Sequence, residues 1–234
     1  MLRYHKQNRF LVAVDCIIFG FDGKELKLLV VKRDLEPEKG KWSLMGGFVQ
    51  PNEDADAAAK RVLKQLTGLE GVYLEQLQTF SNPDRDTVER TISVAYFALI
   101  DIFKYEKQMS EEYHPEWFST SKIPTLIFDH SEMVAKAKSK LQYKAAFHPI
   151  LFELLPLKFT LQQLQTLYEA IYETSFDKRN FTRKIQASKL VIKQKDKEKE
   201  SSKKGAFYYK LDKKKYAANF ESFLNFVPNP NQIK

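Results

Sequence analysis

Residues 47–69 read GFVQPNEDADAAAKRVLKQLTGL, a glycine turn followed by an alanine-rich run that ends at a second glycine. The run from Asp54 to Leu66 predicts a helix, because Asn52 can cap its first turn and the neighbouring acidic residues suit the positive end of the helix dipole. Gly68 suits a left-handed C-cap. Segments on both sides predict strands, so this helix is embedded between strands.

Apolar or alternating segments place the predicted strands at 11–21, 26–31, 42–49, 72–80 and 91–102, with a short one starting at Glu116. A second helix is predicted over 129–143, capped by Asp129 or Ser131. Strands mixed with two helices predict an α+β fold. Its first domain, residues 1–144, is expected to be an α/β/α sandwich with a mixed sheet.

The pattern changes after Lys144. We expect a short apolar helix over 147–155, a helix opened by Thr160 with one apolar face, and a helix over 178–188 capped by Asp177. A strand beginning at 190–192, a polar tip that ends at Gly205, and a strand over 206–211 complete the series. This order predicts a winged helix-turn-helix, and residues 145–234 are taken as the second domain.

Charge divides the chain in the same way. Residues 145–234 hold 17 Lys and Arg against 9 Asp and Glu, an excess of eight that equals the net charge of the whole chain, +8. The first 144 residues are therefore neutral. A neutral half joined to a basic half favours a division of labour between the two domains.

The spacing in residues 47–69 resembles the Nudix box. Its positions are occupied here, with no insertion, by Gly47, Glu53, Arg61, Leu63, Gly68 and Leu69. The preceding KGKWSLMGGFVQPNED resembles the segment before the box in ADP-ribose-type Nudix enzymes, with Met45 in place of the usual proline. Glu116-Trp117-Phe118 resembles a short strand near the end of these domains.

Three glutamates of the box are missing, and their positions hold Val62, Gln65 and Leu66. Nudix enzymes need those carboxylates on one helical face to bind Mg²⁺, and valine and leucine offer no oxygen to a hard cation. The four histidines are scattered, which argues against zinc. The sequence therefore predicts no catalytic residue, no metal site and no cofactor.

A Nudix sheet still forms a cleft when its metal site is lost. Carboxylates and amides there can hydrogen-bond sugar hydroxyls, and an aromatic ring can pack on a sugar face. The candidate ligand-binding residues are Asp15, Arg33, Trp42, Glu53, Asn82, Asp84, Asp86 and Arg90, with Arg85 as a further polar group nearby. The alternatives are that the loop residues are solvated charges, that Trp42 is structural, and that Glu53 braces the loop through Arg61.

The helix capped by Asp177 is the candidate recognition helix, because Phe181 and Ile185 point inward and basic residues cover the other side. Arg or Asn near the start of such a helix can read base edges, and lysines on a wing tip can lie along phosphates. The candidate DNA-binding residues are Lys178, Arg179, Asn180, Arg183, Lys184, Lys199, Lys203 and Lys204. For the lysine tip the alternative is a solvated hairpin loop.

The whole chain resembles the Nudix-related transcriptional regulators. This resemblance implies a homodimer that binds a palindromic double-stranded DNA operator as a repressor and releases it when a small-molecule effector occupies the Nudix domain. One branch of these regulators responds to ADP-ribose or a relative. The arabinose-responsive branch of sugar-utilising bacteria gives the nearest resemblance, so the sequence favours L-arabinose and regulation of sugar utilisation, with an ADP-ribose or NAD-related effector as the alternative.

Two other classes of protein stay open. One is an active Nudix hydrolase of sugar nucleotides, and the other is an RNA-binding or adaptor protein. A single cysteine, Cys16, excludes an intrachain disulfide. The polar N-terminal residues do not resemble a signal peptide, and the apolar stretch from Leu11 is too short for a membrane span. We therefore expect a cytoplasmic protein with no membrane partner.

Overall fold

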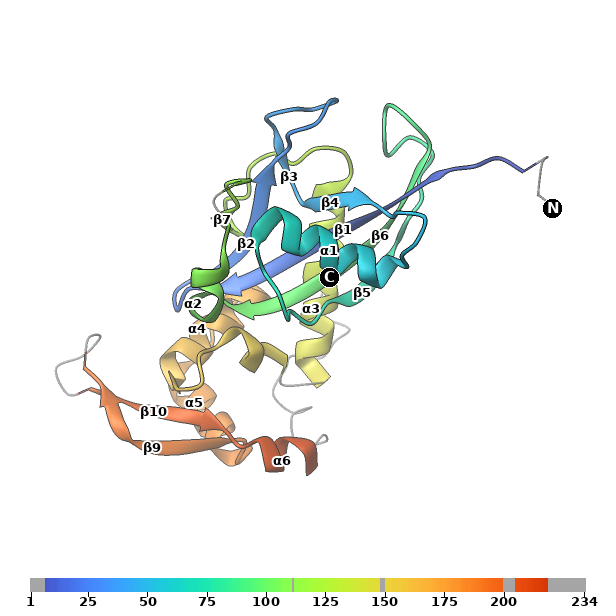
Figure 1. The fold of residues 1–234 in the computed structure, drawn as a ribbon. Helices are drawn as coiled ribbons and strands as arrows, with labels where there is room; N and C mark the ends of the chain where they lie inside the picture. The colour runs from blue at the N-terminus through green and yellow to red at the C-terminus, as the bar shows by residue number, and fades with distance from the viewer. Residues whose placement is uncertain (1–6, 111, 148–149, 200–204, 219–234) are drawn as a thin grey trace.

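The computed structural model describes residues 7–110, 112–147, 150–199 and 205–218 (Figure 1). Its large sheet consists of β1 (Leu11–Phe21), β2 (Leu26–Lys32), β3 (Trp42–Ser43), β4 (Met45–Phe48), β5 (Glu75–Phe80), β6 (Thr91–Asp101) and β7 (Glu116–Ser119). The strand order is β3-β2-β1-β6-β5, with β4 also paired to β1 and β7 to β2. β1 runs parallel to β6 and antiparallel to β2 and β4, which confirms the mixed sheet.

Two helices cover opposite faces of this sheet, α1 (Ala55–Thr67) and α3 (His130–Phe147). The side chains of β1 alternate between the two faces of the sheet, and because a helix covers each face, both sets are buried. Val14, Cys16 and Ile18 pack with α1, whereas Ile17 and Phe19 pack with α3. Burial raises the pKa of the Cys16 thiol, as fits a structural cysteine.

The cap of α1 differs from the sequence prediction at its first turn. Asp54, not Asn52, is the N-cap residue, and its carboxylate accepts a hydrogen bond of 2.7 Å from the backbone N–H of Ala57. The helix therefore begins two residues later than an Asn52 cap requires. The expected C-cap is confirmed, because Gly68 has a φ of 77°.

The smaller part is a winged helix, as predicted. It comprises the 3₁₀ helix η2 (Ile150–Leu154), β8 (Phe159–Thr160), α4 (Leu161–Tyr172), α5 (Lys178–Ala187), β9 (Val191–Glu198), β10 (Ala206–Leu211) and α6 (Lys213–Ala218). Its sheet has the order β8-β10-β9. The predicted cap of α4 is present as a capping box between Thr160 and Gln163.

Several element boundaries differ from the sequence prediction. β9 continues to Glu198, through residues predicted as a polar tip, because its backbone pairs with β10 and its charged side chains stay exposed. The strand expected from Val72 begins at Glu75, and the helix expected over 147–155 is only the short η2. The helices α2 (Ile102–Tyr105) and η1 (Glu106–Gln108), and the strand β8, were not predicted. All three are very short and carry little periodic signal.

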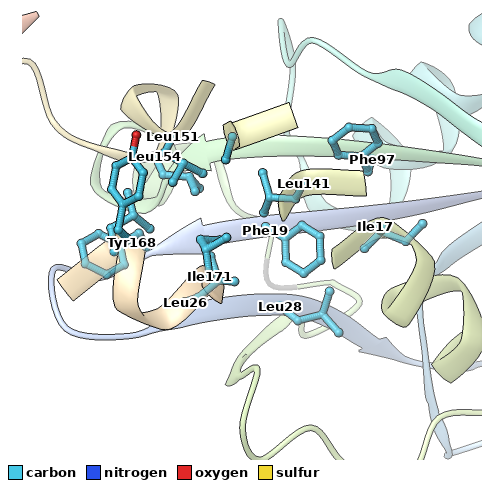
Figure 2. Packing of buried hydrophobic residues seen from close by; sticks show 14 of the residues in the cluster. Ile17, Phe19, Leu26, Leu28, Phe97, Leu141, Leu151, Leu154, Tyr168 and Ile171 are labelled. Atoms are coloured by element: carbon cyan, nitrogen blue, oxygen red, sulfur yellow. The ribbon is translucent and has the colours of Figure 1, made fainter. Parts of the chain in front are cut away.

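A continuous apolar core joins the two parts. Figure 2 shows Phe19 of β1 and Leu141 of α3 in the same cluster as Tyr168 and Ile171 of α4. Polar contacts reinforce it, since Gln142 donates to the carbonyl of Ile171 at 2.8 Å. The predicted domain boundary at 144/145 falls inside α3, and that boundary stays a prediction. Among the described residues, no helix is both long and apolar enough to cross a membrane.

Candidate effector cleft and nucleic-acid interface

A cavity of about 350 Å³ opens beside β1, β2 and α1, and we call it the cleft. Asp15 and His130, both almost fully buried, line it from β1 and from the start of α3. One wall carries Val62, Gln65 and Leu66, the residues that replace the glutamates of the Nudix box. Their side chains make this wall largely apolar.

A buried ionic cluster lies at the floor of the cleft. Arg85, only 7% exposed, donates two hydrogen bonds to Asp129, at 2.9 and 2.7 Å, and its guanidinium lies 3.5 Å from Asp15. Burial alone would lower the pKa of Arg85, but the hydrogen bonds to Asp129 and the charge of Asp15 raise it. Arg85 therefore stays charged and ties β1 to the residue just before α3.

His130 completes this cluster as a neutral side chain. Burial lowers the pKa of the imidazole and outweighs the opposing effect of Asp15. Its Nδ1 accepts a hydrogen bond of 3.1 Å from the backbone N–H of Leu44, so the proton of the neutral ring sits on Nε2. Nε2 faces Asp15, with 3.5 Å between Nε2 and Oδ1.

Gly46 leaves room for the Asp15 carboxylate. The two residues are register partners on β4 and β1. A Cβ atom on Gly46 would lie 2.4 Å from Asp15 Oδ1 and would displace the carboxylate. The first glycine of the Gly46-Gly47 pair thus keeps one oxygen of Asp15 facing the cleft.

The residues of the box do not fit a magnesium ion. Val62 and Leu66 have no donor atom, and the remaining carboxylate of the box, Glu53, is engaged by Arg61 through hydrogen bonds of 2.9 and 2.5 Å. This contact lowers the pKa of Glu53. Within the described ranges, no three His, Cys, Asp or Glu side chains gather closely enough to hold a metal ion. We therefore derive no metal-dependent step for this cleft.

The structure brings three of the predicted ligand-binding residues, Asp15, Arg33 and Asp86, to the cleft. Asn82 and Asp84 instead line a neighbouring hollow of about 550 Å³, which shares Arg85 with the cleft. The Asn82 side chain also accepts a hydrogen bond of 3.0 Å from the backbone N–H of Asp84, so it helps to shape its own loop.

Trp42, Glu53 and Arg90 were predicted to bind the ligand; they do not line this cavity, and each has a structural contact. The Trp42 ring packs edge-on against Phe118, with 4.9 Å between their centroids. Glu53 braces the loop through Arg61, which was the stated alternative for it. Arg90 donates to the backbone carbonyls of Ser81 and Asn82 and holds their loop.

Two residues of the cluster were missed as site residues. Asp129 was expected only as a helix cap, and the scattered spacing of the four histidines gave no reason to single out His130. Neither has a local motif, and they meet Asp15 only through the tertiary fold. The one signal in the sequence was an aspartate, Asp15, inside an otherwise apolar strand.

The candidate recognition helix, α5, has the predicted faces. Lys178, Arg179, Asn180, Arg183 and Lys184 of α5 are all exposed, whereas Phe181 and Ile185 are buried. Asp177 caps the helix by accepting the N–H of Asn180 at 2.8 Å. The side chain of Asn180 in turn accepts a hydrogen bond of 3.0 Å from Arg183, which orients both groups on the exposed face.

The wing adds positive charge beside α5. Lys193 and Lys197 of β9 lie over the ring of Phe207 on β10, at 3.7 and 4.4 Å from its centroid. Lys199 is exposed just beyond β9. Lys203 and Lys204, also predicted to bind DNA, lie outside the described residues. The described part of the wing is thus a basic hairpin, as DNA backbone contact requires.

Comparisons with known proteins agree with this architecture. Residues 9–137 match the NUDIX domain family, and residues 151–211 match the family described as the NrtR DNA-binding winged helix domain. The "ADPR responsive transcriptional repressor NtrR" of Acinetobacter baylyi is 33% identical over 220 residues, which cover 92% of this chain and 88% of the relative.

Two solved structures are also similar. Shewanella oneidensis NrtR complexed with a 27mer DNA has a TM-score of 0.74 at 27% identity, covering 88% of this chain and 95% of that one. The NUDIX domain of the same NrtR complexed with ADP ribose has a TM-score of 0.50 at 27% identity, covering 60% of this chain and 94% of that one.

A NUDIX domain followed by a DNA-binding winged helix defines a class of two-domain transcriptional regulators. Within this class the chain belongs to the NrtR-like family. The family resemblance expected from the sequence is thereby confirmed at the level of the class. The comparisons give no support to its arabinose-responsive branch.

Proposed function

We propose that the protein is a transcriptional repressor that binds a DNA operator through α5 and the β9–β10 wing, and that ADP-ribose in the cleft releases it. The observation that carries this proposal is the joining of a cleft without a metal site to a basic winged helix. The similar repressor is described as ADPR-responsive, and the similar NUDIX domain was crystallised with ADP ribose. This favours the alternative effector over L-arabinose and sugar utilisation.

The helix α3 gives a physical route from the cleft to the DNA-binding part. It begins beside the Arg85–Asp129 ion pair at the floor of the cleft. Its later turns contact α4 through Gln142 and through a hydrogen bond of 2.9 Å from Tyr172 Oη to the Gln142 carbonyl. We propose that a ligand that moves the start of α3 changes the placement of two winged helices in a cytoplasmic homodimer, so that both no longer fit half-sites one helical turn apart.

Thermal unfolding of the full chain tests the effector. ADP-ribose at 100 times its dissociation constant should raise the free energy of unfolding by about 2.7 kcal/mol, because it binds only the folded state. L-arabinose and NAD serve as comparison ligands. The same ADP-ribose concentration should lower the affinity for duplexes that the protein selects from a random pool. Unchanged stability and DNA affinity with ADP-ribose would contradict this effector.

We further propose that the protein does not hydrolyse nucleotides. The apolar wall of Val62 and Leu66 cannot supply the carboxylates that a Mg²⁺-dependent reaction needs. Incubation of the purified chain with ADP-ribose and Mg²⁺ should therefore release no AMP above the rate without protein. Turnover that disappears on chelation of Mg²⁺ would instead establish the hydrolase.

A further inference from the structure

The Asp15 carboxylate at the floor of the cleft has unused capacity to accept hydrogen bonds. It is 4% exposed, yet its described partners give it one short hydrogen bond, from Ser93 Oγ to Oδ2 at 2.5 Å. Arg85 and His130 are each 3.5 Å away, beyond a normal hydrogen-bond length. Because an ionised carboxylate has about four lone-pair sites, a ligand in the cleft meets an acceptor that is ready for donors.

The charges around Asp15 limit which ligand groups can bind there. The cluster contains two carboxylates, Asp15 and Asp129, and one guanidinium, Arg85, while the buried His130 is neutral. Asp86 and Arg33 also act on this cluster and cancel each other, so the floor has an excess of one negative charge. A phosphate or carboxylate placed beside Asp15 would be repelled, whereas an uncharged hydroxyl group can donate to it.

Donors and acceptors alternate at this floor. The Asp15 carboxylate is a hydrogen-bond acceptor. The Nε2–H of His130 and the guanidinium of Arg85 are hydrogen-bond donors that face it. Two neighbouring hydroxyl groups of a sugar ring present the matching pattern, since each can donate to the carboxylate and accept from a neighbouring N–H. We propose that Asp15, with Arg85 and His130, binds a vicinal diol of a sugar ring.

The cleft also has basic residues that can hold an anion. The exposed Lys32 and the half-buried Arg33 line the cavity next to Asp34, so this segment carries a net positive charge. A diphosphate attached to a sugar at the floor can reach these cations. This arrangement deepens the proposed function, on which it rests, by assigning the sugar to the floor and the diphosphate to Lys32 and Arg33.

Two ligands can supply such a diol, the ribose of ADP-ribose and a free pentose such as L-arabinose. Isothermal titration of the full chain with each ligand distinguishes them. Asp15→Asn removes the charge but keeps the shape, and should weaken the sugar ligand about 10- to 100-fold, as expected for lost hydrogen bonds to a charged group. Gly46→Ala should cause a similar loss, because its Cβ displaces Asp15 Oδ1.

Asp101→Asn is the matched control. It makes the same change of side chain at a residue at the end of β6 that does not line the cleft, so this variant should keep the ligand affinity within about threefold. Circular dichroism and thermal unfolding identify variants that fold. If folded Asp15→Asn and Gly46→Ala bind the ligand like wild type, or if Asp101→Asn loses as much affinity as Asp15→Asn, the inference is overturned.

The wild-type chain separates this inference from the proposed function. If the wild-type chain binds ADP-ribose, and Asp15→Asn weakens that binding, the proposed effector and the diol site are both supported. If it binds L-arabinose but not ADP-ribose, and Asp15→Asn weakens the pentose, the diol site holds and the proposed effector fails. If it binds neither ligand, both are wrong.

Discussion

An Arg85→Met variant is expected to have a free energy of unfolding about 3–5 kcal/mol below that of wild type. Arg85 is the cation that lies within 4 Å of both Asp15 and Asp129 in the described structure, and its side chain is 4% exposed. Removing it leaves two carboxylates at the floor of the cleft without the cation that both contact. Chemical denaturation of the full chain measures the change.

Arg90→Met is the matched control for this variant. Arg90 is on the same loop, but its described hydrogen bonds go to backbone carbonyls that water can reach. Arg90→Met should lower the free energy of unfolding by about 1 kcal/mol. Arg85→Met combined with Asp129→Asn should recover part of the lost stability, because one of the two anions is then neutral. If Arg85→Met and Arg90→Met lower the free energy of unfolding equally, the stabilising role of the buried Arg85–Asp129 ion pair is contradicted.

The sequence predicted the parts of the site that rest on local spacing. The box residues Gly47, Glu53 and Arg61 are close in sequence, and a helix and turn of standard geometry bring them together. The outward face of α5 follows in the same way from Phe181 and Ile185, four residues apart on one buried face. Such features depend on a single element and its caps, which a sequence encodes directly.

The polar floor of the cleft could not be predicted, because it depends on distant elements. Asp15 meets Ser93 through the parallel pairing of β1 with β6, and it meets His130 only where α3 crosses the sheet. These residues are 78 and 115 positions from Asp15 in the sequence. For Trp42, an aromatic near the box suggested a platform for a sugar ring, whereas in the structure its ring packs on Phe118.

The second large effect is expected on DNA affinity, in a double variant of the candidate recognition helix α5. Arg179→Ala combined with Arg183→Ala should lower the affinity for the selected duplexes on the order of 1000-fold, since each arginine that reads a base contributes about 1–3 kcal/mol of discrimination. Both side chains are exposed on α5, and Asn180 orients Arg183. Fluorescence anisotropy at a fixed salt concentration measures the loss.

The double variant Arg179→Lys with Arg183→Lys separates base reading from charge. Lysine keeps the positive charge but lacks the planar fork that pairs with guanine. If α5 reads bases, this variant should retain the salt dependence of binding and the affinity for random duplexes, while its preference for the selected duplexes falls. If α5 only lies along phosphates, the lysine variant should keep that preference nearly intact, because a phosphate contact needs charge but not the fork. The second outcome would move sequence recognition from α5 to the wing, where Lys193 and Lys197 pack on Phe207.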